Sequence, residues 1–180
     1  MIQIKILNLL KIVLKSLVVG SGNISANIIV VGEAPGAQED IEGKPFVGRS
    51  GRFLKKLLDE SGINIFEDVY FCNVVKSRPP NNRKPSSEEI LFHKPWLIQQ
   101  IKLINPKFVI LAGSVAMKAV LEVKEPISLL RGNWFNKNGI GYLPIFHPSY
   151  VMRFSVNEVN NPYGLTLKDL QSVRNKLYNL

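Results

Sequence analysis

Four short apolar runs limit the fold of this chain more than any other feature of its sequence. They cover Asn27–Gly32, Val69–Val74, Phe108–Gly113 and Gly141–Phe146, and none of them alternates with polar residues. Runs of this kind, rich in β-branched and aromatic residues, are typical of strands buried on both faces of a parallel sheet. Pro144 interrupts the last run and places that strand near an edge of the sheet.

Helical patterns lie between these runs and after the last one. We predict helices over residues 49–61, from Ser86 to about Asn105, over 114–122 and over 165–180. A capping box of Ser86 and Glu89 begins the second helix, and Pro95 is expected to kink or split it. The alternation predicts an α/β fold, a three-layer α/β/α sandwich with a central, mostly parallel four-stranded sheet. A length of 180 residues suits one domain, residues 1–180.

The chain is basic and contains a single cysteine. Its formal net charge of +9 favours an anionic partner, with nucleic acid first and an acidic membrane surface second. Cys72 alone permits neither an intrachain disulfide nor a cysteine-based metal centre. A reducing compartment, the cytoplasm, is therefore expected.

Residues 1–16 are apolar with scattered lysines. Lys5, Lys11 and Lys15 interrupt the segment well short of the ~20 apolar residues that a membrane-spanning helix needs. It also lacks the unbroken apolar stretch of a secretory signal. Asn8, Lys11 and Lys15 fall on one helical stripe, which favours an apolar helix packed on the domain. Organelle targeting stays an alternative, because the segment contains no acidic residue.

Three polar segments follow predicted strands, at the edge of a parallel sheet where ligands bind. The first, residues 32–40, makes a tight glycine–proline turn with Glu33 at its floor, but it is not a phosphate-binding glycine motif. In the second, residues 73–85, the Asn73 amide offers donors and an acceptor that match the N3–H and O4 edge of uracil. The third, residues 147–153, holds His147. Their structural alternatives are an acidic surface loop, a solvated basic loop and a structural histidine.

The stretches VVGEAPGAQED, GKPFVGRSG, VYFCNVVKSRPPNNRKP and FHPSY occur in this order between about Leu17 and the C-terminus. Together they resemble the motifs of the family 4 (thermophile-type) uracil-DNA glycosylases. The resemblance implies an enzyme that flips uracil out of DNA and hydrolyses its N-glycosidic bond, leaving an abasic site and initiating base excision repair. It implies a monomer that acts on uracil in single-stranded DNA or opposite guanine, with no membrane partner.

The resemblance also implies roles for individual residues of these motifs. Phe46 stacks on the flipped uracil, Asn73 reads its edge, and His147 stabilises the departing uracil anion. Glu39 excludes the methyl group of thymine, while Glu33, beside Gly32 in the same pocket, positions the attacking water. Contacts to DNA are implied for Arg78, Arg131, Ser149, Tyr150, Val151, Met152 and Arg153, with Tyr150, Val151 and Met152 as an apolar wedge in the minor groove.

The sequence departs from the family at the four-iron, four-sulfur cluster, which the family binds through four cysteines. Cys72 matches a position that is not a ligand. We therefore predict that the chain holds no cluster, no metal and no other cofactor, and that residues 1–16 pack against Phe92 and Trp96 in place of the cluster. The positions that correspond to the ligands are Lys5, Asn8, Ser77 and His93.

Three other functions are weighed against uracil excision. A catalytically inactive DNA-binding relative of the same fold is the first, although every residue of the implied site is present. A relative that cross-links to abasic sites carries a KRRIH-like insertion, which the loop RPPNNRKPS lacks. A nucleotide-binding α/β protein needs a phosphate-binding glycine motif, and the chain has none.

Overall fold

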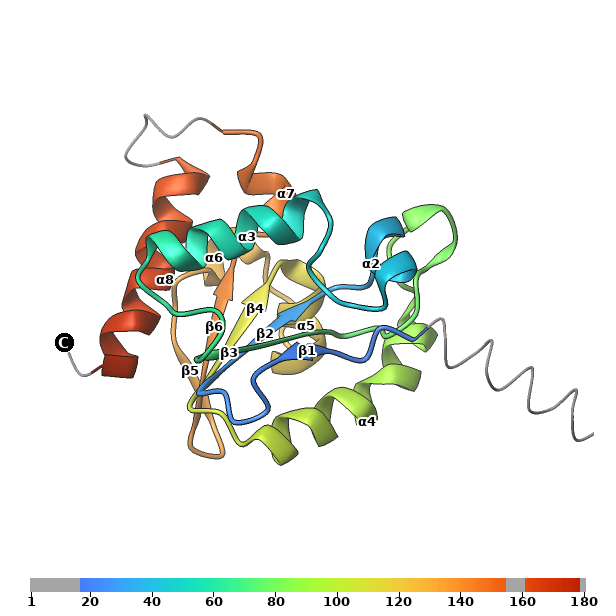
Figure 1. Ribbon diagram of the computed structural model, residues 1–180, viewed down its shortest axis with the longest axis horizontal. Helices are drawn as coiled ribbons and strands as arrows, with labels where there is room; N and C mark the ends of the chain where they lie inside the picture. The colour runs from blue at the N-terminus through green and yellow to red at the C-terminus, as the bar shows by residue number, and fades with distance from the viewer. Residues whose placement is uncertain (1–16, 155–160, 179–180) are drawn as a thin grey trace, which may run out of the picture.

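A computed structural model describes residues 17–154 and 161–178, which form a six-stranded sheet between two layers of helices (Figure 1). The strand order is β1-β3-β2-β4-β6-β5. The central strands pair in parallel and coincide with the predicted apolar runs, so the expected α/β/α sandwich is confirmed. These strands are β2 (Ile28–Gly32), β3 (Val69–Asn73), β4 (Phe108–Ala112) and β6 (Ile140–Ile145).

Two short antiparallel strands that the sequence did not predict flank this parallel sheet. β1 (Ser21–Gly22) pairs with β3, and β5 (Phe135–Lys137) pairs with residues 140–142 of β6. Pro144 therefore lies beyond the end of its edge neighbour, and its carbonyl accepts a hydrogen bond from the Gly132 amide instead. The ring nitrogen of Pro144 points to the same side of β6, where no strand pairs with this residue. The missing N–H therefore costs no hydrogen bond of the sheet, which agrees with the predicted position near an edge.

The longer helices cover the two faces of the sheet (Figure 1). α3 (Arg49–Glu60) and α8 (Pro162–Tyr178) pack on one face, and α4 (Ser87–Ile104) and α5 (Ser114–Leu121) pack on the other. All four match predicted helices, although α8 begins at Pro162 rather than at residue 165. The short elements in the connections are α2 (Ala37–Glu42), the 3-10 helix η1 (Pro80–Asn82), α6 (Ile127–Leu130) and α7 (Pro148–Val151).

Helix α4 begins and ends as its sequence predicts but is not split by its proline. The Ser86 side chain accepts a hydrogen bond from the Glu89 amide and the Glu89 side chain bonds back to Ser86, while Asn105 closes the helix in the left-handed conformation. The predicted split at Pro95 is wrong, because one helix runs through it. Pro95 and Leu91 are both exposed, so water can satisfy the Leu91 carbonyl that the proline leaves without a partner.

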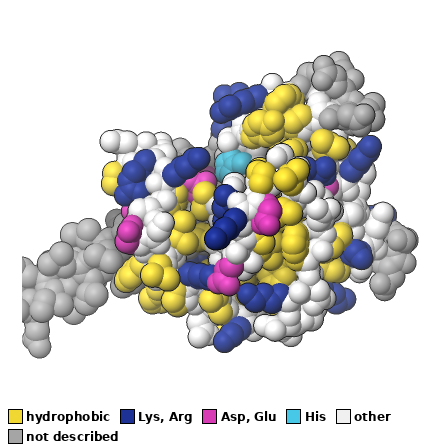
Figure 2. Space-filling model, turned by 180° about the vertical axis from the view of Figure 1, so that it is seen from behind, with side chains coloured by type: hydrophobic (Ala, Val, Ile, Leu, Met, Phe, Trp, Pro, Cys, Tyr) yellow, Lys and Arg dark blue, Asp and Glu magenta, His cyan; other side chains and the backbone are white. Residues whose placement is uncertain are grey.

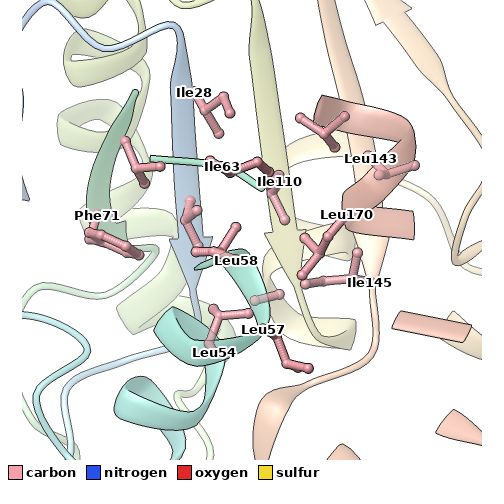
Figure 3. Close-up of a cluster of buried hydrophobic side chains, with 14 of the residues drawn as sticks. Ile28, Leu54, Leu57, Leu58, Ile63, Phe71, Ile110, Leu143, Ile145 and Leu170 are labelled. Carbon is pink, nitrogen blue, oxygen red and sulfur yellow. The ribbon is translucent and has the colours of Figure 1, made fainter. Parts of the chain in front are cut away.

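Alternate residues of the strands face the two helical layers. On one side Leu54, Leu57 and Leu58 of α3 and Leu170 of α8 meet the sheet, and all of them are fully buried (Figure 3). Each such side chain contributes roughly 1.5–3 kcal/mol of hydrophobic stabilisation. The sheet residues that they contact include Ile28, Ile110, Leu143 and Ile145. This core fixes the carboxyl ends of the parallel strands, and the loops of the candidate site are attached there.

The predicted helix over residues 1–16, including Lys5 and Asn8, lies outside the described residues. Its expected partners Phe92 and Trp96 lie on α4 and are 70% and 63% exposed. Within residues 17–154 and 161–178, no helix is both long and apolar enough to cross a membrane.

Candidate active site

A cavity of about 670 Å³ opens at the carboxyl ends of the parallel strands. Its walls come from the loops after β2, β3, β4 and β6 and from the start of α3. Of the residues implied by the resemblance, the cavity brings together Gly32, Glu33, Glu39, Phe46, Asn73, His147, Ser149 and Tyr150. It does not include Arg78, Arg131, Val151, Met152 or Arg153.

Gly32 forms the floor of this cavity because only hydrogen fits on its Cα. A Cβ atom there would overlap the Asn73 Oδ1 atom and lie 2.8 Å from Cζ of Phe46. Any larger residue would therefore enter the space between the amide and the aromatic ring. The backbone of Gly32 also accepts a hydrogen bond from the Val74 amide, which joins the ends of β2 and β3. Gly32 thus provides the space in which a flat ring can lie against Phe46 and Asn73.

Phe46 presents its ring to the cavity from a strained turn. Its φ of +56° lies in the left-handed region, which an aromatic residue rarely adopts. The ring is 9% exposed and its centroid lies 5.4 Å from that of Phe71. Helix α3 approaches so closely that a Cβ on Gly51 would overlap the Phe46 Cα. A strained residue held in this way at a cavity wall is typical of a functional position.

The Glu39 carboxylate accepts backbone hydrogen bonds from two turns, the turn that carries Phe46 and the turn before α2. Its Oε1 atom accepts hydrogen bonds from the amides of Val47, at 3.1 Å, and Gly48, at 2.7 Å. Its Oε2 atom accepts one from the Gly36 amide at 3.1 Å. The carboxylate therefore connects the turn after β2 with the turn that carries Phe46.

Asn73 ends β3 with its side chain at the cavity. The residue is 4% exposed, and its backbone carbonyl accepts a hydrogen bond from the Lys76 ammonium at 2.7 Å. Among the described residues no hydrogen bond uses the Asn73 side-chain amide, which lines the cavity. A buried amide fixed at the end of a strand can pair with a ligand edge that offers one acceptor and one donor.

His147 is oriented by the backbone that follows it. Its Nδ1 atom accepts a hydrogen bond from the Ser149 amide at 3.2 Å and lies 2.7 Å from the Ser149 hydroxyl. Because an amide can only donate, the neutral ring carries its hydrogen on Nε2. Burial lowers the pKa of His147 below its usual 6.5, which favours this neutral form.

Gly113 keeps the His147 ring in place from the other side. It has a φ of +97°, and a Cβ there would lie 2.9 Å from Cδ2 of His147. The sequence contains this glycine at the end of the third apolar run, but only the fold reveals its contact with the ring.

Glu33 follows Gly32 in the cavity wall. Burial raises the pKa of its carboxyl, and the charge of Lys84 opposes that rise. Lys84 lines the same cavity, although the sequence pattern indicated only a basic loop. A carboxylate with a raised pKa is a stronger base than an exposed one, which suits a group that holds or accepts a proton from water.

A row of aromatic rings leads out of the cavity along α7. The centroids of Phe146 and Tyr150 are 5.2 Å apart, and those of Tyr150 and Phe154 are 5.1 Å apart. Tyr150 and Phe154 are 41% and 36% exposed. Phe154 was not among the residues predicted from the sequence, although its i, i+4 spacing from Tyr150 was an available signal.

A second cavity of about 500 Å³ shares Glu39, Ser50 and Ser149 with the first. Met152 and Arg153 line it together with Arg49, which the sequence motifs did not indicate. On the face in Figure 2, a histidine (cyan) is visible among hydrophobic side chains, with Lys and Arg side chains (dark blue) around them. Arg49 and Arg153 of the second cavity thus place two guanidinium groups beside the candidate site.

Two residues implied in DNA contact are placed elsewhere by the fold. Val151 is fully buried in the core cluster, because α7 turns its side chain toward α3 and the sheet. It therefore cannot serve as a wedge. Arg131 forms an ion pair with the buried Asp169 of α8 and donates a further hydrogen bond to the Leu165 carbonyl. Its donors hold the end of α6 against α8 instead of facing a phosphate.

Arg78 lies in the loop after β3, outside the cavity. It donates to Asn82 at 2.8 Å and approaches Asp40 of α2 to 3.8 Å. These contacts connect the loop that contains η1 with the turn after β2.

The described positions that correspond to cluster ligands do not fit an iron–sulfur cluster. The Ser77 hydroxyl lies 3.4 Å from Nε2 of His93, and neither side chain is a thiolate. The only cysteine, Cys72, is buried in β3 and burial raises its pKa, which disfavours the thiolate that iron requires. No group of three or more His, Cys, Asp or Glu that could hold a metal occurs within the described residues.

Comparison with known proteins finds a family model and several uracil-DNA glycosylases that are similar to this chain. The family model described as "Uracil DNA glycosylase superfamily" matches residues 19–171. The chain is 44% identical to a type-4 uracil-DNA glycosylase of Thermotoga maritima over 163 residues, which are 88% of this chain and 82% of the relative. It is 44% identical to a type-4 uracil-DNA glycosylase of Saccharolobus solfataricus over 140 residues, 76% of this chain and 65% of the relative. A type-5 uracil-DNA glycosylase of Pyrobaculum aerophilum is 30% identical over 144 residues, 71% of this chain and 63% of the relative.

Proposed function

This chain belongs to the uracil-DNA glycosylase superfamily, in its type-4 group, and from that premise we propose that the cavity of Phe46, Asn73 and His147 binds uracil. The chain excises uracil from DNA and leaves an abasic site, the first step of base excision repair. The observation that carries the assignment of the site is the convergence of an aromatic ring, an unused amide and a neutral imidazole on one cavity. Each of the three offers a contact that a flipped uracil needs.

The proposed geometry assigns one contact to each side chain. The Phe46 ring stacks on the face of the uracil above Gly32. The Asn73 amide donates to O4 and accepts from N3–H. The Nε2–H of His147 donates to O2, where negative charge develops as the bond between N1 and C1′ breaks.

Water completes the reaction at the sugar. As uracil leaves with the bonding electrons, C1′ gains oxocarbenium character, as in glycoside hydrolysis. The water held by Glu33 adds to C1′, and its released proton passes to the Glu33 carboxylate and then to solvent. Both Glu33 and Ala34 line the cavity at this turn, but the side chain of Ala34 cannot take up a proton. Glu33 is therefore the residue of this pair that can act on the water.

We assign the DNA strand to the surface beside the cavity. The exposed rings of Tyr150 and Phe154 can stack with bases next to the flipped nucleotide, at about 1–3 kcal/mol per base. Arg49 and Arg153 can neutralise phosphates at the second cavity. Stacking surfaces of this kind favour uracil in single-stranded DNA or in a weakened U·G pair, because a paired base must first leave its stack.

We propose that the enzyme works without an iron–sulfur cluster, as a monomer, and inside the cell with the DNA. The contact of Ser77 with His93 supports the first part, because it fills two ligand positions with side chains that bond to each other. Purified protein is expected to be colourless and free of stoichiometric iron. Iron analysis together with an absorption spectrum checks this, and a brown chromophore with bound iron would overturn it.

Cleavage of a labelled oligonucleotide with one uracil, followed by alkali, tests the proposed function directly. Strand breakage at the uracil is expected with the wild-type protein. Absence of breakage in both single and double strands, from folded protein, would favour the alternative of an inactive DNA-binding relative.

The rate of uracil release is expected to fall on acidification as Glu33 takes up a proton. Because burial raises the pKa of this carboxyl, the fall should be centred above the ordinary value of 4.5. Glu33→Gln should lower the rate about 10²-fold, a typical contribution of a positioned base, and remove the acid limb. Single-turnover rates measured against pH test this, and an unchanged limb in Glu33→Gln would assign it to another group.

A further inference from the structure

We infer that Glu39 acts as a positioning residue that holds Phe46 in its strained turn, rather than as a group that meets the base. This inference rests on the proposed function of the cavity. It differs from the role implied by family resemblance, in which the side chain excludes the methyl group of thymine. The contacts of the carboxylate support positioning.

Both carboxylate oxygens of Glu39 are used by the backbone. Oε1 accepts from Val47 and Gly48, the two residues directly after Phe46, and Oε2 accepts from Gly36. Hydrogen bonds to a charged acceptor are stronger than neutral ones. The two bonds from Val47 and Gly48 fix the direction in which the chain leaves Phe46. The bond from Gly36, the N-cap of α2, holds the carboxylate at the start of its own helix.

The conformation of Phe46 needs such an anchor. Without restraint, a residue with a side chain leaves the left-handed region, and the ring would turn away from Gly32. Helix α3 restrains the turn from behind, because Gly51 lies against the Phe46 backbone. Glu39 restrains the turn through its hydrogen bonds with Val47 and Gly48. The Phe46 ring is thereby held between Phe71 and Gly32, the floor of the cavity.

The chemistry of the contact requires a carboxylate. Glutamine has the same length, but its amide offers one oxygen and one NH2 group. An NH2 group facing a backbone N–H cannot accept a hydrogen bond, so Glu39→Gln must lose the bond to Gly36 or the bonds to Val47 and Gly48. Loss at either oxygen loosens the connection between the two turns.

The test compares Glu39→Gln and Glu39→Ala with Asp40→Asn. Asp40 is the next residue of α2 and is also acidic; its carboxylate lies 3.8 Å from the Arg78 guanidinium and lines neither of the two cavities. Both Glu39 variants should lower kcat/KM for uracil release roughly 10- to 10²-fold, since a small misplacement of a contact group has effects of this size. Asp40→Asn should leave it unchanged, and neither Glu39 variant should release thymine from a T·G pair.

A double-mutant cycle with Phe46→Ala separates positioning from direct contact. If Glu39 acts through the ring, Glu39→Gln causes no further loss once the ring is absent. Losses that multiply in the double variant, or release of thymine by Glu39→Ala, would overturn the inference. Either result would assign Glu39 to contact with the base.

Amide hydrogen exchange at Val47 and Gly48 reports their hydrogen bonds with Glu39 and does not depend on enzymatic activity. Both amides should be protected in the wild type and lose protection in Glu39→Ala but not in Asp40→Asn. If the wild type excised no uracil while this pattern held, the proposed function would fail and the positioning role would stand. Unchanged protection of both amides in Glu39→Ala would remove the basis of the inference.

Discussion

His147→Ala is expected to lower the single-turnover rate of uracil release about 10²–10³-fold with little change in affinity for DNA. The expectation follows from the tautomer that the fold imposes. The Ser149 amide occupies Nδ1, so Nε2 carries the hydrogen and can donate to the uracil oxygen on which charge develops. This interaction strengthens only as the glycosidic bond breaks, so its removal slows the chemical step rather than binding.

The other histidine of the chain provides the control for this experiment. His93 lies on α4 with Nε2 near the Ser77 hydroxyl and does not line the cavity. His93→Gln should leave the rate of uracil release unchanged under the same conditions. A His147→Ala enzyme that retained most of its single-turnover rate would show that another group stabilises the departing anion.

The pH response of the wild type adds a further check on the neutral imidazole. The lowered pKa of His147 keeps the ring neutral as the pH falls through 6.5, the usual histidine value. The folded state therefore binds fewer protons at this position than the unfolded chain. Its contribution to the free energy of unfolding is complete above pH 6.5 and is lost progressively as the pH falls from 6.5 to the lowered pKa of the folded state.

The parallel sheet could be predicted from the sequence because its signal is local. Each central strand is a continuous apolar run that both helical layers bury, so no knowledge of the partner strands was needed. The capping box of Ser86 and Glu89 is local in the same sense. β1 and β5 are short and partly exposed, so their sequences carry no comparable pattern.

The position of the cavity that forms the candidate site could also be predicted, because parallel strands bring their carboxyl ends to one edge. The role of each side chain within it depended on tertiary contacts. Arg131 cannot be told from a surface arginine in the sequence, because its partner Asp169 is a buried residue of α8 that lies far along the chain. Val151 follows two exposed residues and reads as a surface residue, yet the turn of α7 places it in the core. The bonds of Glu39 to Val47 and Gly48 likewise require the two turns to meet in space.

Asn73→Asp is expected to reverse the choice of base, lowering uracil release about 10²-fold or more and creating slow release of cytosine. Uracil needs a donor at O4, and an ionised aspartate has none, so the buried edge would be left without its partner. Cytosine presents an N4–H2 donor and an N3 acceptor. Position 73 is 4% exposed, and burial raises the pKa of a carboxyl placed there. The protonated fraction can accept from N4 and donate to N3.

The comparison with Asn81→Asp separates this effect from that of added charge. Asn81 lies in η1, outside the cavity wall, and the substitution adds a negative charge to the loop after β3. It should weaken uracil release only slightly and give no release of cytosine. Because only the protonated form of the carboxyl introduced by Asn73→Asp pairs with cytosine, release of cytosine should grow as the pH falls. If Asn73→Asp lost uracil release without any gain for cytosine at low pH, the amide would be needed for the fold of the cavity, and base selection would belong to its shape.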